Sequence, residues 1–332
     1  MSTQAQEKML APTDERLIHA LQIEPRASWT DLAPVVGADA ATLGRRWSRL
    51  RDDGIAWVTG FRPRRQLALI EIECEPAQIE ATARELARDP AVWVLDCCSG
   101  ARDLLAIVSF DDLATLSEYA LRGLGEMKGL RSVRTHPVNE FLVDAANWRL
   151  RALSSEEAAR VRPPRGPRAR AARLVADDLR EAIEAEVWRD GRVPVTDIAE
   201  RHGFSPQRVA DALATLRRNG ELHFRTDLAR EVSGWPVYTW YFVEASARTI
   251  ETVRTSLATV PEVRLAFTSP SRYNLILAVW LRKMADVNRF EMALGSALPD
   301  SRIADRSVVL SIRKHMAQII GPDTRSLGHA GA

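Results

Sequence analysis

The sequence predicts an α+β fold in which a winged-helix-like helix-turn-helix unit is followed by a ferredoxin-like βαββαβ sandwich, and the pair then occurs a second time. Three observations support this prediction. Residues 14–60 match residues 180–226 at a constant offset. The segments after each copy alternate between strand-like and helix-like periods in the order β-α-β-β-α-β. The chain has 332 residues, which is more than one ordinary domain needs.

The first helix-turn-helix is predicted within residues 12–62. A short helix over 31–36 precedes a longer helix over 40–52, and Gly37 permits the tight turn between them. Residues 55–61 then run extended, as a wing strand does. Two short helices joined in this way are typical of a unit whose second helix enters the DNA major groove. The longer helix has one narrow apolar stripe, which indicates a buried face and consists of Leu43, Trp47 and Leu50.

The opposite face of this second helix is basic, and a further basic group follows the wing strand. Arginine can bond phosphates and guanine edges, while residues at the start of the helix, such as Asp39 and Ala41, lie near base edges. Any single arginine is readily explained as a solvated surface residue, but the whole set indicates DNA binding. The predicted contacts of this unit are Thr42, Arg45, Arg46, Arg49, Arg62, Arg64 and Arg65.

The second helix-turn-helix, predicted within residues 174–230, keeps an apolar stripe but has fewer positive charges. In the middle of its second helix, Asp211 stands where the first copy has Arg45. Residues 40–65 contain seven Arg and two acidic residues, whereas residues 206–231 contain five Arg and four acidic residues. A phosphate-binding surface with an acid at its centre binds more weakly. Whether this unit contacts DNA stays open, and its candidate contacts are Arg208, Arg217 and Arg218.

Two sandwiches are predicted, over residues 65–150 and 234–320. In each, the third strand is uniformly apolar, which indicates a central strand. The matching segments are strands at 66–72 and 237–244, helices at 79–87 and 250–257, strands at 92–98 and 263–268, strands at 104–110 and 275–281, helices at 112–121 and 285–294, and strands at 132–138 and 306–311.

Residues 151–173, between the two halves, form an Arg- and Pro-rich linker, in which Pro and Gly exclude a helix. It is interpreted either as a solvated tether or as a basic strap that follows DNA phosphates. Its arginines are Arg160, Arg162, Arg165, Arg168, Arg170 and Arg173.

Composition limits the class of protein. The net charge is only +2, so a DNA-binding surface must arise from local placement of charge. The three cysteines, Cys74, Cys97 and Cys98, show no zinc spacing and are odd in number, which favours a reducing cytoplasm. The sequence has no signal peptide and no apolar run of about 18 residues. It lacks the common nucleotide-binding and hydrolase motifs, so we expect no enzyme, no cofactor and no metal.

Three stretches of the first helix-turn-helix form a distinctive set. They are Asp14-Glu15-Arg16-Leu17-Ile18, then Leu32-Ala33 with Val36-Gly37, and then Leu43-Gly44-Arg45-Arg46-Trp47 with Asp53-Gly54-Ile55. The set resembles the amino-terminal signature of Lrp/AsnC (feast/famine) transcription regulators. The resemblance covers almost the whole chain twice, more loosely in the second half. It implies DNA binding, sensor (RAM) domains that dimerise through their sheets, and a small effector, commonly an amino acid, bound between them.

The resemblance also implies an effector site at a Gly-x-x-Asp motif before the third sandwich strand, which stands here as Gly100-Ala101-Arg102-Asp103. Glycine lets a ligand approach the backbone, and aspartate can hold an ammonium group. An ordinary turn between strands is the alternative. The second half has Ser271-Arg272-Tyr273-Asn274 instead, which casts doubt on amino-acid binding there or implies a different ligand. The candidate effector residues are Gly100, Arg102, Asp103, Ser271, Tyr273 and Asn274.

Two copies in one chain suggest an intrachain pseudo-dimer that reads an asymmetric DNA site, with further homo-oligomers formed through the sensor sheets. One alternative is a sirohaem-decarboxylase-like enzyme, a class that resembles this family and has His and Arg around an Asn-Leu strand start. Tyr273-Asn274-Leu275 matches that pattern faintly, without an adjacent His. The other alternative is a sensor or assembly module that does not bind DNA. The basic face of the first recognition helix favours the DNA-binding regulator.

Overall fold

The chain forms two compact units, and each combines segments from both halves of the sequence. The helical unit consists of residues 1–64 and 149–229, and the sheet unit consists of residues 65–148 and 230–332. The two helix-turn-helix copies therefore share one unit, and the two sandwiches share the other. Within the described residues, no helix is long and apolar enough to cross a membrane. The computed structural model describes residues 10–63, 66–163, 166–168, 174–254 and 256–330.

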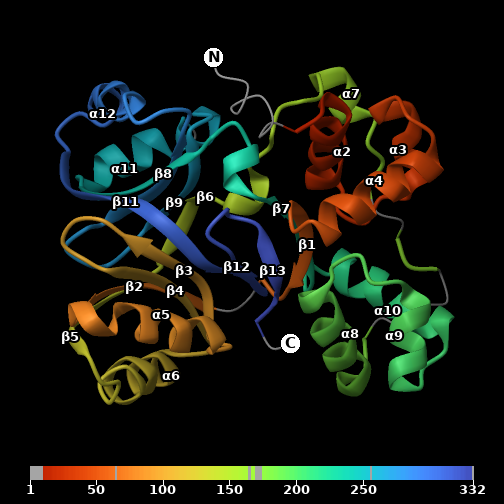
Figure 1. Ribbon diagram of the computed structural model, residues 1–332, viewed down its shortest axis with the longest axis horizontal. Coiled ribbons are helices and arrows are strands. Elements are labelled where there is room, and N and C mark those ends of the chain that lie inside the picture. The colour runs from red at the N-terminus through yellow and green to blue at the C-terminus, as the bar shows by residue number, and fades with distance from the viewer. Residues whose placement is uncertain (1–9, 64–65, 164–165, 169–173, 255, 331–332) are drawn as a thin grey trace. The chain divides into compact units, whose positions relative to one another are not determined.

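Each helix-turn-helix copy contains three helices and one strand (Figure 1); for the first copy, the sequence predicts the last two helices and the strand. The first copy consists of α2 (Pro12–Ile23), α3 (Trp29–Val36), α4 (Ala40–Asp52) and β1 (Ala56–Phe61). The second copy consists of α8 (Asp177–Arg189), α9 (Val195–His202), α10 (Pro206–Arg218) and β7 (His223–Leu228).

The turns before the two recognition helices, α4 and α10, form for the reasons predicted. Gly37 and Gly203 end the preceding helices in the left-handed region, at φ +83° and +71°. The side chains of Asp39 and Ser205 then accept hydrogen bonds from backbone N–H groups in the first turns of α4 and α10. The buried residues of α4 are the predicted stripe of Leu43, Trp47 and Leu50.

The linker contains a helix that the sequence analysis excluded. Helix α7 (Ser155–Ala159) begins with a capping box between Ser154 and Glu157. The prediction was wrong for this segment because the run of Pro and Gly starts only at residue 163.

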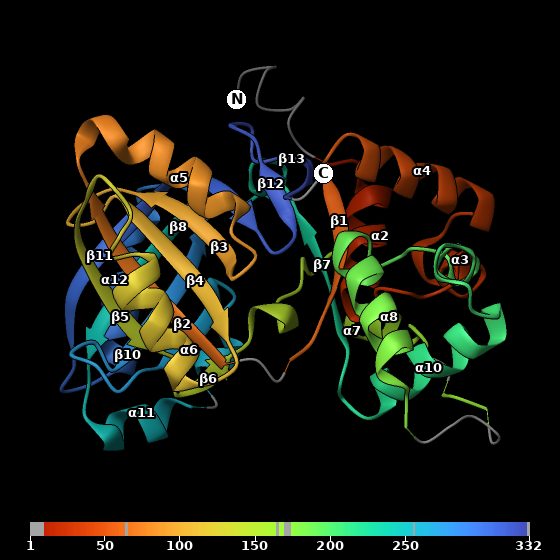
Figure 2. The same cartoon turned by 90° about the horizontal axis from the view of Figure 1, so that it is seen from below.

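Strands β1 and β7 join the two helix-turn-helix copies in an antiparallel two-stranded ribbon (Figure 2). Val58 lies opposite Thr226, and Gly60 lies opposite Phe224. Both pairs fit a twofold exchange of the copies, in which residues 166 positions apart are equivalent. The centre of the exchange is the pair Thr59 and Arg225. The helical unit is therefore a pseudo-dimer built within one chain.

The sheet unit contains both βαββαβ sandwiches, so the predicted α+β fold, repeated once, is confirmed. The first sandwich and its extension consist of β2 (Gln66–Cys74), η1 (Pro76–Gln78), α5 (Ile79–Arg88), β3 (Val92–Cys98), β4 (Leu104–Phe110), α6 (Leu113–Glu118), η2 (Tyr119–Gly123), β5 (Leu130–Pro137), β6 (Glu140–Val143) and η3 (Ala145–Asn147). The second consists of η4 (Arg230–Val232), β8 (Val237–Glu244), α11 (Ala247–Val253), η5 (Leu257–Thr259), β9 (Val263–Thr268), β10 (Leu275–Leu281), α12 (Asp286–Ala297), β11 (Arg302–His315), β12 (Gln318–Ile320) and β13 (Ser326–His329).

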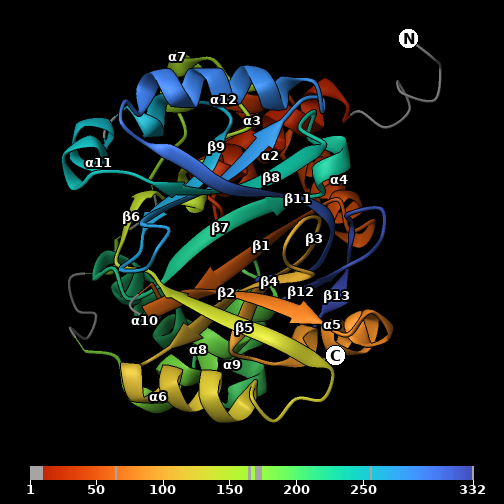
Figure 3. The same ribbon diagram turned by 90° about the vertical axis from the view of Figure 1, so that its left-hand side faces the viewer.

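The two sandwiches exchange strands (Figure 3). The first part of β11 pairs with β8 of its own sandwich, and its last part pairs with β3 of the other. In the same way, β6 extends from the first sandwich to pair with β9 of the second. The strand order is therefore β5-β2-β4-β3-β11-β8-β10-β9-β6. Strands β6, β12 and β13 were not predicted, because strands of only three or four residues leave little periodic signal.

Candidate nucleic-acid interface and ligand sites

The outward face of α4 presents the residues predicted to contact DNA. Arg45 is exposed and donates a hydrogen bond of 3.0 Å from Nη2 to the hydroxyl of Thr42, one turn earlier. Arg62 is exposed just after β1. Arg64 and Arg65 lie outside the described residues. Thr42 and Arg45 together form a compact polar site at the start of the recognition helix, where base edges are contacted in this kind of unit.

Two of the predicted arginines have a structural partner that the sequence did not reveal. Arg46 and Arg49 each form an ion pair of 2.9 Å with Asp14 on α2, whose side chain is only 4% exposed. Arg46 is half-buried, so its main role is to hold α4 against α2. Arg49 remains 59% exposed, which leaves donors available for a phosphate.

In the second copy too, some of the candidate DNA contacts are exposed, whereas another is paired with a carboxylate of the protein itself. Arg208 and Arg218 are exposed on α10. Arg217 is not on that surface, because its guanidinium pairs with Glu24 at 2.8 Å and lies 5.1 Å from the ring centre of Phe224. The expectation that Arg217 contacts DNA is therefore corrected, since the residue holds the two copies together.

Reciprocal arginines connect the two copies across the pseudo-twofold axis. Arg26 donates to the carbonyls of Gly191 and Val193 at 2.5 and 2.9 Å. Its equivalent, Arg192, donates to the carbonyls of Pro25 and Ala27 at 2.6 and 3.0 Å. Burial and the neighbouring arginines lower the pKa of both guanidinium groups to about 10. Each guanidinium group is thus buried against the other copy and bonded to its backbone carbonyls.

Outside these reciprocal bonds, an ion pair between Arg51 and Asp190 at 3.7 Å mirrors that between Arg217 and Glu24. The longer distance and greater exposure of the Arg51 pair make it the weaker of the two. Equivalent residues therefore form the interface on both sides of the pseudo-twofold axis, but the two ion pairs differ in strength.

The linker is bonded to both copies within its described part. Leu153 N–H donates to His19 Nδ1 at 2.8 Å, and Glu157 pairs with Arg16 at 2.9 Å. Arg162 then pairs with Asp31, and Arg168 pairs with Asp211 on α10. These contacts do not fit a free tether. Arg165, Arg170 and Arg173 lie outside the described residues.

The two loops expected to bind an effector brace the sheet unit internally. The carboxylate of Asp103 accepts a hydrogen bond of 2.7 Å from the backbone N–H of Cys74, at the end of β2. Asn274 takes the equivalent place, accepting from Ala245 N–H at 2.9 Å and donating to its carbonyl at 2.7 Å. The change from Asp to Asn therefore preserves a structural bond. Gly100 lies at φ +93° close to the backbone of Arg306.

Arg102 is buried at the junction of the two sandwiches, with its side chain 1% exposed. It bonds Glu71 of its own sandwich at 2.5 Å, and Asp305 and Ser307 of the second at 2.5 and 2.6 Å. The guanidinium also lies 4.1 Å from the ring centre of Phe242. All these bonds are internal, so Arg102 acts as a core connector between the sandwiches.

His136 on β5 belongs to the same junction and was missed by the sequence analysis. Its Nε2 lies 2.6 Å from Glu71, and its Nδ1 lies 2.9 Å from the hydroxyl of Ser271. The ring lies 5.8 Å from that of Tyr273. No motif marks this histidine, since its partners are 65 to 137 positions away.

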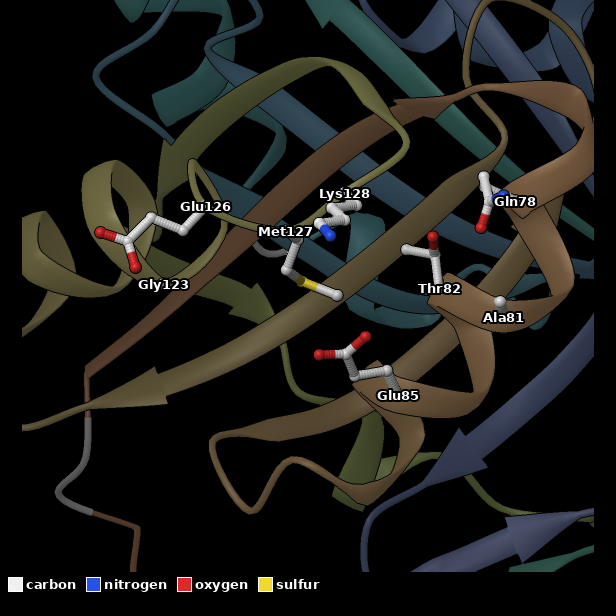
Figure 4. A pocket seen from close by; sticks show the side chains of 8 residues that line it. All are labelled: Gln78, Ala81, Thr82, Glu85, Gly123, Glu126, Met127 and Lys128. Carbon is white, nitrogen blue, oxygen red and sulfur yellow. The ribbon is translucent and has the colours of Figure 1, made fainter.

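A hollow of about 410 Å³ lies on the outer side of the first sandwich, between α5 and the segment after η2 (Figure 4). Glu85 and Thr82 come from α5, and Lys128 and Met127 come from the segment after η2. Figure 4 shows the carboxylate of Glu85 and the hydroxyl of Thr82 on the side that faces Met127 and Lys128. Groups of opposite charge therefore line one concave surface. The lining consists of Gln78, Ala81, Thr82, Glu85, Gly123, Glu126, Met127 and Lys128.

Comparison with protein families finds two known domains in the first half of the chain. Residues 12–51 match the AsnC-type helix-turn-helix domain, and residues 67–147 match the Lrp/AsnC ligand binding domain. The first half of the chain is thus similar to both domains of the Lrp/AsnC family, in line with the sequence resemblance.

Individual relatives agree with this placement. An uncharacterized HTH-type transcriptional regulator of Pyrococcus furiosus is 29% identical over 146 residues, which is 42% of this chain and 96% of that protein. The HTH-type transcriptional regulator FL11 of Pyrococcus horikoshii is 20% identical over 148 residues, which is 44% of this chain and 97% of that protein. Among solved structures, the siroheme decarboxylase NirDL is similar over 91% of this chain and 93% of its own, with a TM-score of 0.61 and 14% identity. This last likeness concerns the fold alone.

Proposed function

We propose that this protein is a sequence-specific DNA-binding transcription regulator in which one chain supplies a pair of recognition helices. The observation that supports it best is the pseudo-dimer of the helical unit, formed by the β1–β7 ribbon and the reciprocal bonds of Arg26 and Arg192. Helix-turn-helix proteins bind two half-sites by pairing two such units about a twofold axis. A single chain then presents the two recognition helices that other helix-turn-helix proteins bring together by forming a dimer.

The two recognition helices contribute unequally. Helix α4 offers Thr42, Arg45 and the exposed end of Arg49, whereas α10 offers Arg208 and Arg218 beside Asp211. The stronger positive charge of α4 favours this helix as the one that anchors the protein on its half-site. The preferred operator is therefore asymmetric, and the protein works in the compartment that holds the chromosome.

The first experiment is fluorescence anisotropy with the DNA upstream of its own gene, a random duplex of equal length and a salt series. We expect selective binding and one chain per operator. Arg45→Ala should weaken it about tenfold, as expected for loss of one good base or phosphate contact. Arg84→Ala removes another exposed arginine, from the sheet unit, and serves as the control. Equal binding of both duplexes by the wild type would refute the proposal, while light scattering tests for homo-oligomers.

We further propose that a small zwitterion of amino-acid size binds the sheet unit in the hollow shown in Figure 4. A ligand site needs polar groups that are free to bond the ligand, and Arg102, Asp103 and Asn274 already bond the chain itself. Glu85 suits an ammonium group and Lys128 suits a carboxylate. The volume of about 410 Å³ lies in the range of small-molecule sites.

Thermal unfolding in the presence of each common amino acid tests this site. The effective ligand should raise the melting temperature of the wild type, and this increase should disappear in Glu85→Ala and Lys128→Ala. Glu118→Ala, an exposed change on α6 away from the hollow, is the control. If the shift persists in both hollow variants, the ligand binds elsewhere and this assignment is wrong.

A second candidate function, a sirohaem-decarboxylase-like activity, rests on the whole-chain fold shared with NirDL and on His136 beside Tyr273. It ranks second because Arg102 is already neutralised by Glu71 and Asp305. A tetrapyrrole with many carboxylates would have to separate those pairs. Titration with iron-uroporphyrin III, followed by its absorption spectrum, decides the matter. A spectral change that His136→Ala abolishes supports this candidate, and an unchanged spectrum removes it.

A further inference from the structure

A half-buried serine meets a buried histidine where the two sandwiches pair. Ser271 lies in the loop between β9 and β10 of the second sandwich. Its hydroxyl oxygen lies 2.9 Å from Nδ1 of His136, which stands on β5 of the first sandwich. The serine therefore faces a ring nitrogen within the distance that proton transfer to a general base requires.

The other ring nitrogen of His136 is held by a carboxylate. Its Nε2 lies 2.6 Å from Oε1 of Glu71, whose side chain is only 2% exposed. Burial alone would raise the pKa of Glu71, but the bond from His136 and the charge of Arg102 lower it overall. An ionised carboxylate only accepts hydrogen bonds. The hydrogen of the neutral ring is therefore on Nε2, and the lone pair of Nδ1 faces Ser271.

Neighbouring groups hold these three side chains in place. Arg102 bonds Oε2 of Glu71 at 2.5 Å, which leaves Oε1 for the histidine. The rings of Phe242 and Tyr273 lie 6.4 and 5.8 Å from the imidazole ring. The hydroxyl of Ser271 also lies 3.1 Å from the carbonyl oxygen of Tyr273, within its own loop. A nucleophile, a base and a carboxylate that orients the base thus stand in series.

The repeat shows that the fold itself does not require this series. Residues 171 positions apart are equivalent in the two sandwiches, since Leu69 pairs with His136 in the first and Trp240 pairs with Ser307 in the second. The positions equivalent to the serine, the histidine and the carboxylate hold Gly100, Ser307 and Phe242. Only one of the two symmetric positions therefore combines the three groups.

We propose that Ser271 is a nucleophile that hydrolyses small carboxylic esters, with His136 as its general base and Glu71 as the residue that positions the base. The Oγ of Ser271 attacks the carbonyl carbon while its proton moves to Nδ1 of His136. The bond to the leaving oxygen then breaks, and that oxygen takes the proton, which leaves an acyl group on Ser271. Water next gives a proton to Nδ1 and attacks the acyl carbon. The carboxylic acid leaves, and the proton returns to Ser271.

The surroundings of Ser271 favour an ester with a flat apolar part. The ring of Tyr273 is half-buried beside the serine, and aromatic rings pack well against such a face. An aryl ester also needs little assistance to release its leaving group, because a phenolate is a more stable anion than an alkoxide. The probe substrate is therefore p-nitrophenyl acetate. The proposed activity does not depend on DNA binding.

The first test uses a fluorophosphonate, which forms a covalent bond to an activated serine and releases fluoride. Peptide mass spectrometry of the labelled full chain should find the label on Ser271. Ser271→Ala should remove it, and His136→Ala should slow labelling by about 100-fold or more. Ser269→Ala is the matched control, since its buried hydroxyl lies on the same loop without a hydrogen-bond partner in the described part of the chain. It should label at the wild-type rate.

Glu71→Gln provides a second test if His136→Ala does not fold. It keeps the size of the side chain but removes the charge that selects the tautomer. Labelling of Ser271 should become slower, and ¹⁵N NMR should show part of the ring hydrogen moved from Nε2 to Nδ1. A merely structural role of Glu71 would not move that hydrogen. Melting temperatures establish that each variant is folded.

Turnover completes the test. The wild type and Ser269→Ala should hydrolyse p-nitrophenyl acetate at equal rates, and Ser271→Ala should fall to the rate of the buffer alone. Hydrolysis by the wild type that is no faster than by Ser271→Ala overturns the proposal. Absence of label on Ser271, or equal labelling rates in the wild type and in folded His136→Ala, overturns it as well.

Discussion

Gly191 lies in the turn between α8 and α9, where the second helix-turn-helix meets the first. Its N–H donates to the carbonyl of Val58 on β1 at 2.7 Å, and its own carbonyl accepts from Arg26. A Cβ at this position would lie 2.4 Å from Val58 Cγ1 and 2.9 and 3.0 Å from the carbonyl carbon and oxygen of Val58. Replacing Gly191 by alanine therefore tests the pseudo-dimer directly.

The magnitude follows from these contacts. The methyl group of Val58 is buried and the other two atoms are backbone, so β1 itself must move. Overpacking of this kind costs about 1–3 kcal/mol, and weakening the bond between Gly191 and Val58 adds about 1 kcal/mol. We expect Gly191→Ala to lose about 2–4 kcal/mol of unfolding free energy. Gly166→Ala, where a Cβ meets nothing within 4 Å, should change it by less than about 0.5 kcal/mol.

Urea unfolding measures the loss, and the transition of the helical unit is followed separately if the two compact units unfold in two steps. Hydrogen exchange on the peptides covering β1 and β7 shows whether the ribbon opens. Val58→Ala combined with Gly191→Ala should recover part of the loss, since it removes only the side-chain clash. Unchanged protection of the ribbon in Gly191→Ala would refute the packing of the two copies described above.

Three further predictions concern the sheet unit. Burial raises the pKa of Asp96 to about 6. Between pH 4 and 6 the folded chain keeps a proton that the unfolded chain has lost, so the unfolding free energy of the wild type should fall as the pH rises through this range. Asp96→Asn should gain up to about 3 kcal/mol at pH 8 and little at pH 4, measured by urea unfolding. Arg102→Ala leaves Glu71 without its buried cation and should cost about 3–5 kcal/mol, partly recovered by adding Glu71→Gln. Gly295→Ala, in open space on α12, should raise stability by about 0.5–1 kcal/mol, and a melting temperature that fails to rise would contradict it.

The sequence was most informative where structure depends on near neighbours. The helical stripe of Leu43, Trp47 and Leu50 is set by spacing within one helix. The left-handed turns at Gly37 and Gly203 are set by residue type. The order of strands and helices in the sandwiches follows from the same local periodicity. These features were predicted because their physical causes lie within a few residues of each other.

Tertiary structure decided which charged residues are available to a ligand. Arg46 and Arg49 form ion pairs with Asp14, although Arg49 stays largely exposed, and Arg217 forms an ion pair with Glu24. A basic residue looks the same in a sequence whether it faces DNA or a buried carboxylate, because the partner lies 32 to 193 positions away.

The sequence by itself therefore determined the modules, their repetition and the more basic of the two helices proposed to read DNA. Only the tertiary structure decided that the two helix-turn-helix copies pair through the β1–β7 ribbon and that the two sandwiches pair through the shared strand β11. It also decided that Arg102 and His136 meet at one buried junction. The physical reason is that strand pairing and burial of charge are made between distant segments. Their energy depends on the partner's position in space, which local periodicity does not encode.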